Sequence, residues 1–237
     1  MRLAIQLYTL RTMDPVAALP TLGAQGYEAV ELYAEPDDAL ELRRRLDDAG
    51  LEACGWHVGL ERFDGAFDEV VEQARILGVP RLVVPWADPP PDRARAEALA
   101  ERLATLRERV AAAGFPLGYH NHDHELEPLA DGTVTLDVLA EVDGLELELD
   151  LGWLWVAGAD PVARLATHAG RVPLVHAKDF ANRETSVPVG DGVVGYDRIV
   201  SAARDAGVEW LIVEQEEHPG DPLDSTARSA EALRSLL

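Results

Sequence analysis

The sequence predicts a single (β/α)8 barrel, the TIM-barrel class, with residues 1–237 forming one domain. Short apolar runs rich in β-prone residues alternate with helix-forming segments, eight of each, and no linker-like stretch divides them. Strict alternation predicts a parallel sheet, and eight repeats with no spare strand favour a closed barrel over an open sheet. The length agrees, because one such barrel typically takes about 250 residues.

The first four strand-helix pairs follow from the apolar runs and from helix start and stop signals. Asp14 and Pro15 mark the start of the first helix, which Pro20 is expected to interrupt or kink. Gly50 ends the second helix, and a proline-rich loop at 88–92 precedes the fourth. The expected strands are 2–8, 27–32, 51–58 and 81–86, and the expected helices start at Pro15 and span 39–50, 67–78 and 93–113.

The second four pairs show the same alternation, with one longer connection. A polar loop is expected from Lys178 to about Gly195, and its glycines lack the spacing of a phosphate cradle. No G-x-G-x-x-G follows the first strand, which argues against a dinucleotide-binding sheet. The expected strands are 115–122, 145–151, 172–177 and 209–215, and the expected helices are 134–141, 161–170, 197–206 and 225–237.

Composition restricts the possible partners and the compartment. The chain has 43 acidic and 21 basic residues, a formal charge of −22 at pH 7, which repels nucleic acid and anionic membranes. Cys54 is the single cysteine, so no intrachain disulfide can form. The chain begins without a long apolar region or cleavage signal, and no apolar stretch approaches 18 residues, so a cytoplasmic protein is expected.

Potential metal ligands stand at the ends of the last four expected strands. They are His120, Asp150, His176 and Glu214, separated by steps of roughly 25 to 40 residues that match successive barrel strands. The carboxyl ends of barrel strands meet at one mouth, so we expect these groups to converge there. Imidazole with carboxylate suits Mn²⁺, Zn²⁺, Co²⁺ or Mg²⁺.

Each of these residues also has a simpler interpretation. His120, His122 and His124 alternate and would share one face of an extended segment, but a single histidine is more often an ordinary loop residue. Asp150 could cap the next helix. It is the occurrence of four candidates on consecutive strand ends that favours a site.

Other residues at the expected mouth are candidates for substrate binding. Lys178 could hold a substrate oxygen, although a surface lysine is an equally good interpretation, and Trp153 could pack on a sugar face or simply on the barrel rim. The absence of a phosphate-gripping glycine loop favours an unphosphorylated substrate. The full set expected to bind substrate is Gln6, Glu31, His57, Trp86, Trp153 and Lys178.

At these residues the chain resembles the xylose isomerase-like superfamily of barrels. The resemblance is to its bacterial sugar phosphate isomerase/epimerase group, which includes inosose dehydratases, inosose isomerases and hydroxypyruvate isomerases. The resemblance covers nearly the whole chain. GYHNHD, VHAKDF and the VEQ end of the last strand are specific when they occur together. The matching segments are IQLYTLR, GYEAVEL, GYHNHDHE, LDLGWLWVAGADP, VHAKDF, VPVGDGVVGYD and EWLIVEQEE.

The resemblance implies a divalent metal held by one residue from each of the last four strands, which by position are His120, Asp150, His176 and Glu214. Many relatives have glutamate on strand five, where it doubles as a catalytic base, and this chain has His120 there. Relatives also often carry histidine where this chain has Trp153. Metal affinity and substrate class are therefore expected to differ from those of the better-known epimerases.

The leading functional hypothesis is a metal-dependent isomerase or epimerase of a keto-sugar or cyclic keto-polyol, acting through an enediolate. Glu214 is the expected base on one face of the substrate, with His120, His122 or Glu125 on the other. A dehydratase would share the first step and then expel a β-hydroxyl. A non-catalytic sugar-binding or partner subunit is a third possibility, whereas apurinic-site endonuclease chemistry is disfavoured by the negative charge. The sequence leaves open the exact substrate, the metal and whether the chain forms a homo-oligomer.

Overall fold

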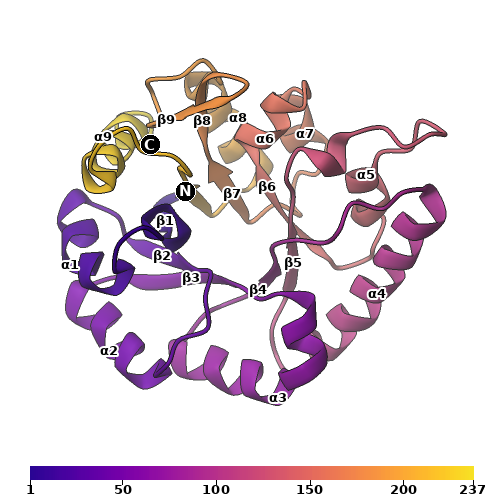
Figure 1. Ribbon diagram of the computed structural model, residues 1–237, viewed down its shortest axis with the longest axis horizontal. Coiled ribbons are helices and arrows are strands. Elements are labelled where there is room, and N and C mark those ends of the chain that lie inside the picture. The colour runs from indigo at the N-terminus through magenta and orange to yellow at the C-terminus, as the bar shows by residue number, and fades with distance from the viewer.

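Eight parallel strands close into a barrel in the computed structural model, which describes residues 1–237 (Figure 1). β1 pairs with β2 on one side and with β10 on the other, so the sheet has no free edge. The predicted barrel is confirmed. Its strands, in spatial order, are β1 Arg2–Gln6, β10 Trp210–Val213, β7 Leu174–Ala177, β6 Glu146–Asp150, β5 Leu117–His120, β4 Leu82–Val84, β3 Glu52–His57 and β2 Ala29–Leu32.

Helices surround the barrel, and most begin at an aspartate whose carboxylate accepts hydrogen bonds from the first turn. Asp14 Oδ1, for example, accepts from the backbone N–H groups of Val16 and Ala17. α1 continues through Pro20, so the expected interruption does not end this helix. The helices are α1 Pro15–Gln25, α2 Ala39–Ala49, α3 Leu60–Leu77, α4 Arg93–Ala112, α5 Thr135–Ala140, α6 Leu151–Val156, α7 Pro161–Thr167, α8 Tyr196–Ala206 and α9 Pro222–Arg234, with short 3-10 turns η1 Leu7–Leu10 and η2 His124–Leu126.

Three segments differ from expectation. α3 starts at Leu60 rather than at residue 67, with a kink at Ala66 where the backbone leaves the helical region. α6 follows β6 directly, where the sequence predicts no helix. The expected polar loop contains a hairpin, β8 Asp179–Asn182 and β9 Thr185–Val187.

The hairpin and the turn after it are held by one buried carboxylate. Asp179 accepts hydrogen bonds from the backbone N–H groups of Gly190, Gly192 and Val194. A Cβ on Gly192 would overlap Asp179 Oδ1, so this close approach requires glycine. This polar segment is therefore ordered, because its backbone is hydrogen-bonded to the Asp179 carboxylate.

The two ends of the barrel differ in character. At the amino end, Arg81 is buried and its guanidinium contacts Glu146 Oε2 at 3.1 Å and Glu209 Oε2 at 3.2 Å. These ion pairs join residues from β6 and from the segments that precede β4 and β10. The carboxyl end instead carries buried histidines and carboxylates. None of the helices is both long and apolar enough to cross a membrane.

Candidate metal and substrate site

The four residues expected to bind metal come together at the carboxyl end of the barrel. His120 ends β5, Asp150 ends β6, His176 lies in β7 and Glu214 directly follows β10. These four strands are consecutive neighbours in the barrel, and one ligand atom from each residue lies within 4.8 Å of the others. All four side chains are buried. We call these residues the mouth group.

The donor atoms of the mouth group suit a divalent cation. Asp150 Oδ1 accepts from the backbone N–H of Trp153 at 2.8 Å and so caps α6, which leaves Oδ2 without a hydrogen bond although it is buried. Asp150 is thus a helix cap with one oxygen and a candidate ligand with the other. Two imidazoles and two carboxylates form a set that Mn²⁺, Zn²⁺ or Co²⁺ accepts. The residues present fit such an ion.

Burial and neighbouring charges set the protonation of this group. Burial raises the pKa of Asp150 to about 6, although the Lys178 ammonium acts in the opposite direction. Burial would also raise the pKa of Glu214, but Lys178 and His176 hold it well below its usual range. Burial and the neighbouring His176 lower the pKa of His120 well below its ordinary value, so this imidazole is neutral and keeps a lone pair for a cation.

His176 lies between carboxylates on both sides of its ring. Its Nδ1 is 2.7 Å from Glu214 Oε2, and its Nε2 is 2.7 Å from Glu31 Oε2 and 3.0 Å from Glu148 Oε1. Burial alone would lower the pKa of His176, but these carboxylates, Glu148 foremost, raise it well above its ordinary value. A cation bound at either ring nitrogen would displace that nitrogen's proton to solvent, while the other nitrogen donates to a carboxylate.

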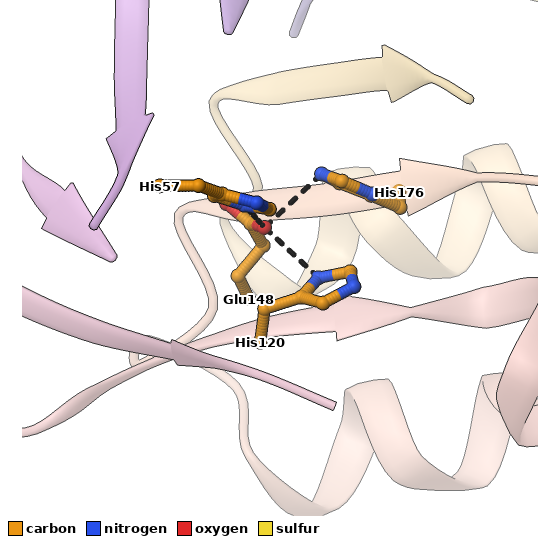
Figure 2. A group of neighbouring side chains, drawn as sticks. All are labelled: His57, His120, Glu148 and His176. Atoms are coloured by element: carbon orange, nitrogen blue, oxygen red, sulfur yellow. Dashed lines mark hydrogen bonds and ion pairs between the residues drawn. The ribbon is translucent and has the colours of Figure 1, made fainter. Parts of the chain in front are cut away.

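Glu148 is a site residue that the sequence analysis missed. The alternation of leucine and glutamate in this strand suggests a solvent-like face, yet the Glu148 side chain is only 1% exposed and points into the barrel. Its Oε1 lies 2.7 Å from His57 Nε2 and 2.9 Å from His120 Nδ1, as well as close to His176 (Figure 2). The strand period carries a signal: if Asp150 faces inward, the residue two positions earlier must do so too.

Glu31, expected to bind substrate, lies below the cleft. It is fully buried, and its Oε2 accepts from Gln6 Nε2 at 2.9 Å and faces His176. Glu31 therefore positions these side chains. Gln6 and His57 do line the cleft. Burial would lower the pKa of His57, but Glu31 and Glu148 raise it to about 10.

Above the mouth group opens a cleft of about 510 Å³, a size that suits a single sugar-sized molecule. Indole rings form part of its wall: Trp86 is 47% exposed, and Trp153 is half-buried. Its lining also includes Gln6, Tyr8, Tyr33, His57, His120, His122, Glu214 and Glu216.

Lys178 lies in the wall beneath this cleft and is only 1% exposed. Its Nζ is 2.8 Å from Glu216 Oε1, 3.2 Å from Asp150 Oδ2 and 3.3 Å from Glu214 Oε2. Burial would lower its pKa, but these carboxylates raise it, so Lys178 is a permanent internal cation. The surface-lysine interpretation is therefore wrong.

The three alternating histidines have different surroundings. His120 belongs to the mouth group, and His122 lines the cleft with no hydrogen bond to Nδ1. Burial, with a smaller effect from Lys178, lowers the pKa of His122 to about 4, so it is a neutral base at pH 7. His124 turns elsewhere: its Nε2 lies 3.3 Å from the carbonyl oxygen of Ala87 and 3.0 Å from Glu125 Oε1.

Glu125 supports this loop from below. It is buried, accepts from Tyr119 Oη at 2.7 Å and accepts from the backbone N–H of His122 at 2.7 Å. It is not among the residues that line the cleft. Glu125 Oε2 thus holds the backbone of His122, while Tyr119 fixes the carboxylate through Oε1.

Glu125→Gln should therefore act through His122. Both Glu125 oxygens accept hydrogen bonds, one from Tyr119 and one from His122, and the glutamine amide has only one oxygen. One donor would therefore face an N–H group, which should lower the unfolding free energy by about 1–3 kcal/mol. We expect a lower midpoint in urea unfolding and a shift of the His122 ring signals by NMR. A variant as stable as the original chain, with unshifted His122 signals, would show that Glu125 does not position His122.

The barrel and this polar mouth define a class of protein: a xylose isomerase-like TIM barrel. The model of that family matches residues 17–236, and the chain belongs to it. The chain is 32% identical over 240 residues to the rhizopine catabolism protein MocC of Rhizobium meliloti, a match that covers 82% of this chain and 72% of that protein.

Two further similarities concern shorter or more distant matches. The chain is 26% identical over 143 residues to an inosose dehydratase of Lacticaseibacillus casei, which covers 52% of this chain and 48% of that protein. The crystal structure of a sugar phosphate isomerase/epimerase from Parabacteroides distasonis superposes with a TM-score of 0.86 at 19% identity, covering 99% of this chain and 98% of the other. The second similarity supports the fold.

Proposed function

We propose that this chain is a divalent-metal-dependent isomerase or epimerase of a keto-sugar or cyclic keto-polyol, acting through an enediolate. The observation that carries the proposal is the convergence of His120, Asp150, His176 and Glu214 within 4.8 Å, beneath a sugar-sized cleft. A divalent cation held by these residues would stabilise the negative charge that develops on the substrate's carbonyl and hydroxyl oxygens.

Two residues are placed to move the proton. Glu214 reaches the cleft from β10, and His122 reaches it from the end of β5, with β7 and β6 between those strands in the barrel. One group takes the proton from the carbon next to the carbonyl, and the electron pair forms a C=C bond as the carbonyl oxygen becomes anionic. Delivery of a proton to the former carbonyl carbon, with the hydroxyl proton passing to the former carbonyl oxygen, isomerises the sugar. Delivery of a proton by the second group to the opposite face of the original carbon epimerises it.

The surroundings keep both groups in the states that this step requires. The Lys178 ammonium, 3.3 Å from Glu214 Oε2, favours the ionised carboxylate. His122 is neutral at pH 7 because burial lowers its pKa. Trp86 and Trp153 would pack against the C–H faces of the substrate and displace water from them.

A second candidate is a dehydratase, which the similarity to inosose dehydratase over 143 residues favours. The same proton would leave first. The enediolate would then expel the β-hydroxyl as water, with a protonated group from the cleft as the acid. The two candidates therefore differ in whether the enediolate is reprotonated or loses water.

Proton exchange in D2O tests the proposal. The protein with Mn²⁺ is incubated with a panel of ketoses and inososes, and NMR detects deuterium at the carbon next to the carbonyl. Incorporation with an isomeric product supports the proposal, and appearance of an unsaturated ketone instead identifies the dehydratase. Sugar binding without any exchange would overturn both and indicate a sugar-binding protein.

His122→Gln, with His124→Gln as its matched control, identifies the second proton-transfer group. Loss of the cleft imidazole should lower exchange by about 100-fold or more, because general acid–base groups typically contribute that much. His124 faces Ala87 and Glu125, so its replacement should cost far less. Equal effects of the two substitutions would remove His122 from the proposed mechanism.

A further inference from the structure

A second group of potential ligands lies deeper in the barrel. It consists of His57, His120, Glu148 and His176, whose ligand atoms also lie within 4.8 Å of one another, and we call it the floor group. Figure 2 shows three imidazole rings arranged around the Glu148 carboxylate. Glu148 precedes Asp150 by two residues on β6, so the floor group is one layer nearer the amino end of the barrel than the mouth group.

The carboxylates of the two groups differ in their cation partners. Asp150 and Glu214 in the mouth group both lie within 3.3 Å of the Lys178 ammonium. Glu148 and Glu31 contact no lysine or arginine, and imidazoles are their ion-pair partners. Buried carboxylates are costly without a cation, and here only imidazoles supply the positive charge. An imidazole can exchange its proton for a metal ion, whereas the Lys178 ammonium cannot, so the floor group can take up a cation without losing its charge balance.

Several buried atoms of this layer lack hydrogen bonds. They are Glu148 Oε2, Glu31 Oε1 and His120 Nδ1. His120 Nδ1 lies 2.9 Å from Glu148 Oε1, yet the geometry is not that of a hydrogen bond. Buried polar atoms are nearly always paired, so such orphans indicate a missing partner. Of these atoms, His120 Nδ1 lies beside Glu148 Oε1 in the floor group and can offer a lone pair to a cation there.

The donor chemistry of the floor group differs from that of the mouth group. Three imidazoles and one carboxylate are the set that tetrahedral Zn²⁺ prefers, whereas a set richer in oxygen suits Mn²⁺ or Mg²⁺. The distances from Glu148 Oε1 to the three nitrogens are 2.7, 2.9 and 3.0 Å. Bonds of about 2.0–2.1 Å give a tetrahedral edge of about 3.3 Å, so each of these three oxygen–nitrogen distances would lengthen by only a few tenths of an ångström.

The shared histidines make the two groups alternatives. His176 faces Glu214 with Nδ1 and Glu148 with Nε2, at 2.7 and 3.0 Å. A neutral imidazole has one lone pair, so His176 can serve an ion on one side while its N–H donates to the carboxylate on the other. Moving the ring proton from one nitrogen to the other would exchange the two sites.

We propose that the floor group is a second cation site, selective for Zn²⁺-like ions, which competes with the mouth group for His120 and His176. An ion in the floor group leaves Asp150 and Glu214 paired with Lys178, so neither carboxylate is a ligand of that ion. Zinc held there would occupy the protein without the ligand set on which the proposed reaction depends. The proposal goes beyond the proposed function, since it concerns which ion each layer binds.

Metal binding to the purified, metal-free chain tests this directly. Zn²⁺ affinity is measured by competition with a chromophoric chelator, and Mn²⁺ binding is measured by electron paramagnetic resonance. Glu148→Gln should weaken Zn²⁺ binding by about 100-fold and Mn²⁺ binding by less than about threefold, whereas Asp150→Asn should do the reverse. At saturation with both ions, metal analysis should find one ion per chain. Co²⁺ should show the intense visible bands of four-coordinate cobalt.

The matched control is Glu127→Gln, which removes an exposed carboxylate and should change neither affinity. If Glu148→Gln does not fold, as judged by circular dichroism, His57→Gln replaces it with the same expected result. Zn²⁺ affinity unchanged by the floor substitution, or lost with Asp150→Asn, would overturn the second site. Two ions bound per chain would overturn the competition. None of these measurements needs turnover, so their outcome is separate from that of the exchange experiment.

Discussion

Glu214→Gln is expected to lower kcat by about 10²–10⁴-fold, because an amide cannot accept the proton that leaves the substrate. The replacement has nearly the same size and keeps a carbonyl oxygen toward the mouth group. We expect KM to change much less than kcat. The measurement is steady-state kinetics on the substrate found by exchange, at saturating Mn²⁺ so that weaker metal binding does not contribute.

Glu217→Gln is the matched control for this change. Glu217 lies three residues further along and is exposed, so its loss should leave kcat within about twofold. If turnover of Glu214→Gln also stays within a few-fold, the base is elsewhere in the cleft, and the assignment of Glu214 fails.

Asp150→Asn should weaken Mn²⁺ binding by about 100-fold or more while leaving the barrel folded. Outer residues of metal sites typically contribute 10–100-fold in affinity, and a charged ligand contributes at least as much. The fold should survive because Asn can still accept from the backbone N–H of Trp153 and cap α6. Metal content after dialysis and the thermal midpoint check the two parts of this expectation.

Asp160→Asn separates the capping role of Asp150 from its metal role. Asp160 Oδ1 caps α7 by accepting from the backbone N–H of Val162 at 3.0 Å, away from the mouth group. The same chemical change there should leave Mn²⁺ affinity unaltered. Metal content preserved in Asp150→Asn would mean that Asp150 serves α6 alone.

The barrel was predictable because each strand combines β-prone apolar residues with a clear stop. The convergence of His120, Asp150, His176 and Glu214 followed from topology, since consecutive parallel strands end at one mouth. A residue at the end of a strand can be placed at the mouth from the strand order alone, without knowing its side-chain conformation.

The rest required coordinates for identifiable reasons. Glu148 and Glu146 are identical residues two positions apart on β6, yet one lies within a cluster of imidazoles and the other pairs with Arg81. Their different surroundings depend on how deep each side chain lies in the barrel, and the alternation of apolar and polar residues along a strand does not specify that depth. The hairpin after β7 depends on hydrogen bonds from backbone N–H groups to Asp179. α6 follows Asp150, which caps this helix, but the sequence pattern pointed more strongly to a metal ligand at that position.

Lys178 shows a third reason. Two residues after His176, it could have faced solvent or the barrel, and the choice depends on acidic residues on other strands. Long-range charge pairing of this kind is invisible to local patterns. It nonetheless sets the protonation of Glu214 and so affects the proposed chemistry.

The ion pairs of Arg81 with Glu146 and Glu209 lie at the amino end of the barrel. The mouth group lies beneath the cleft at the opposite end. In the proposed reaction, a sugar bound between Trp86 and Trp153 would lie over an ion held there. We therefore expect bound substrate to slow the exchange of one ion for another.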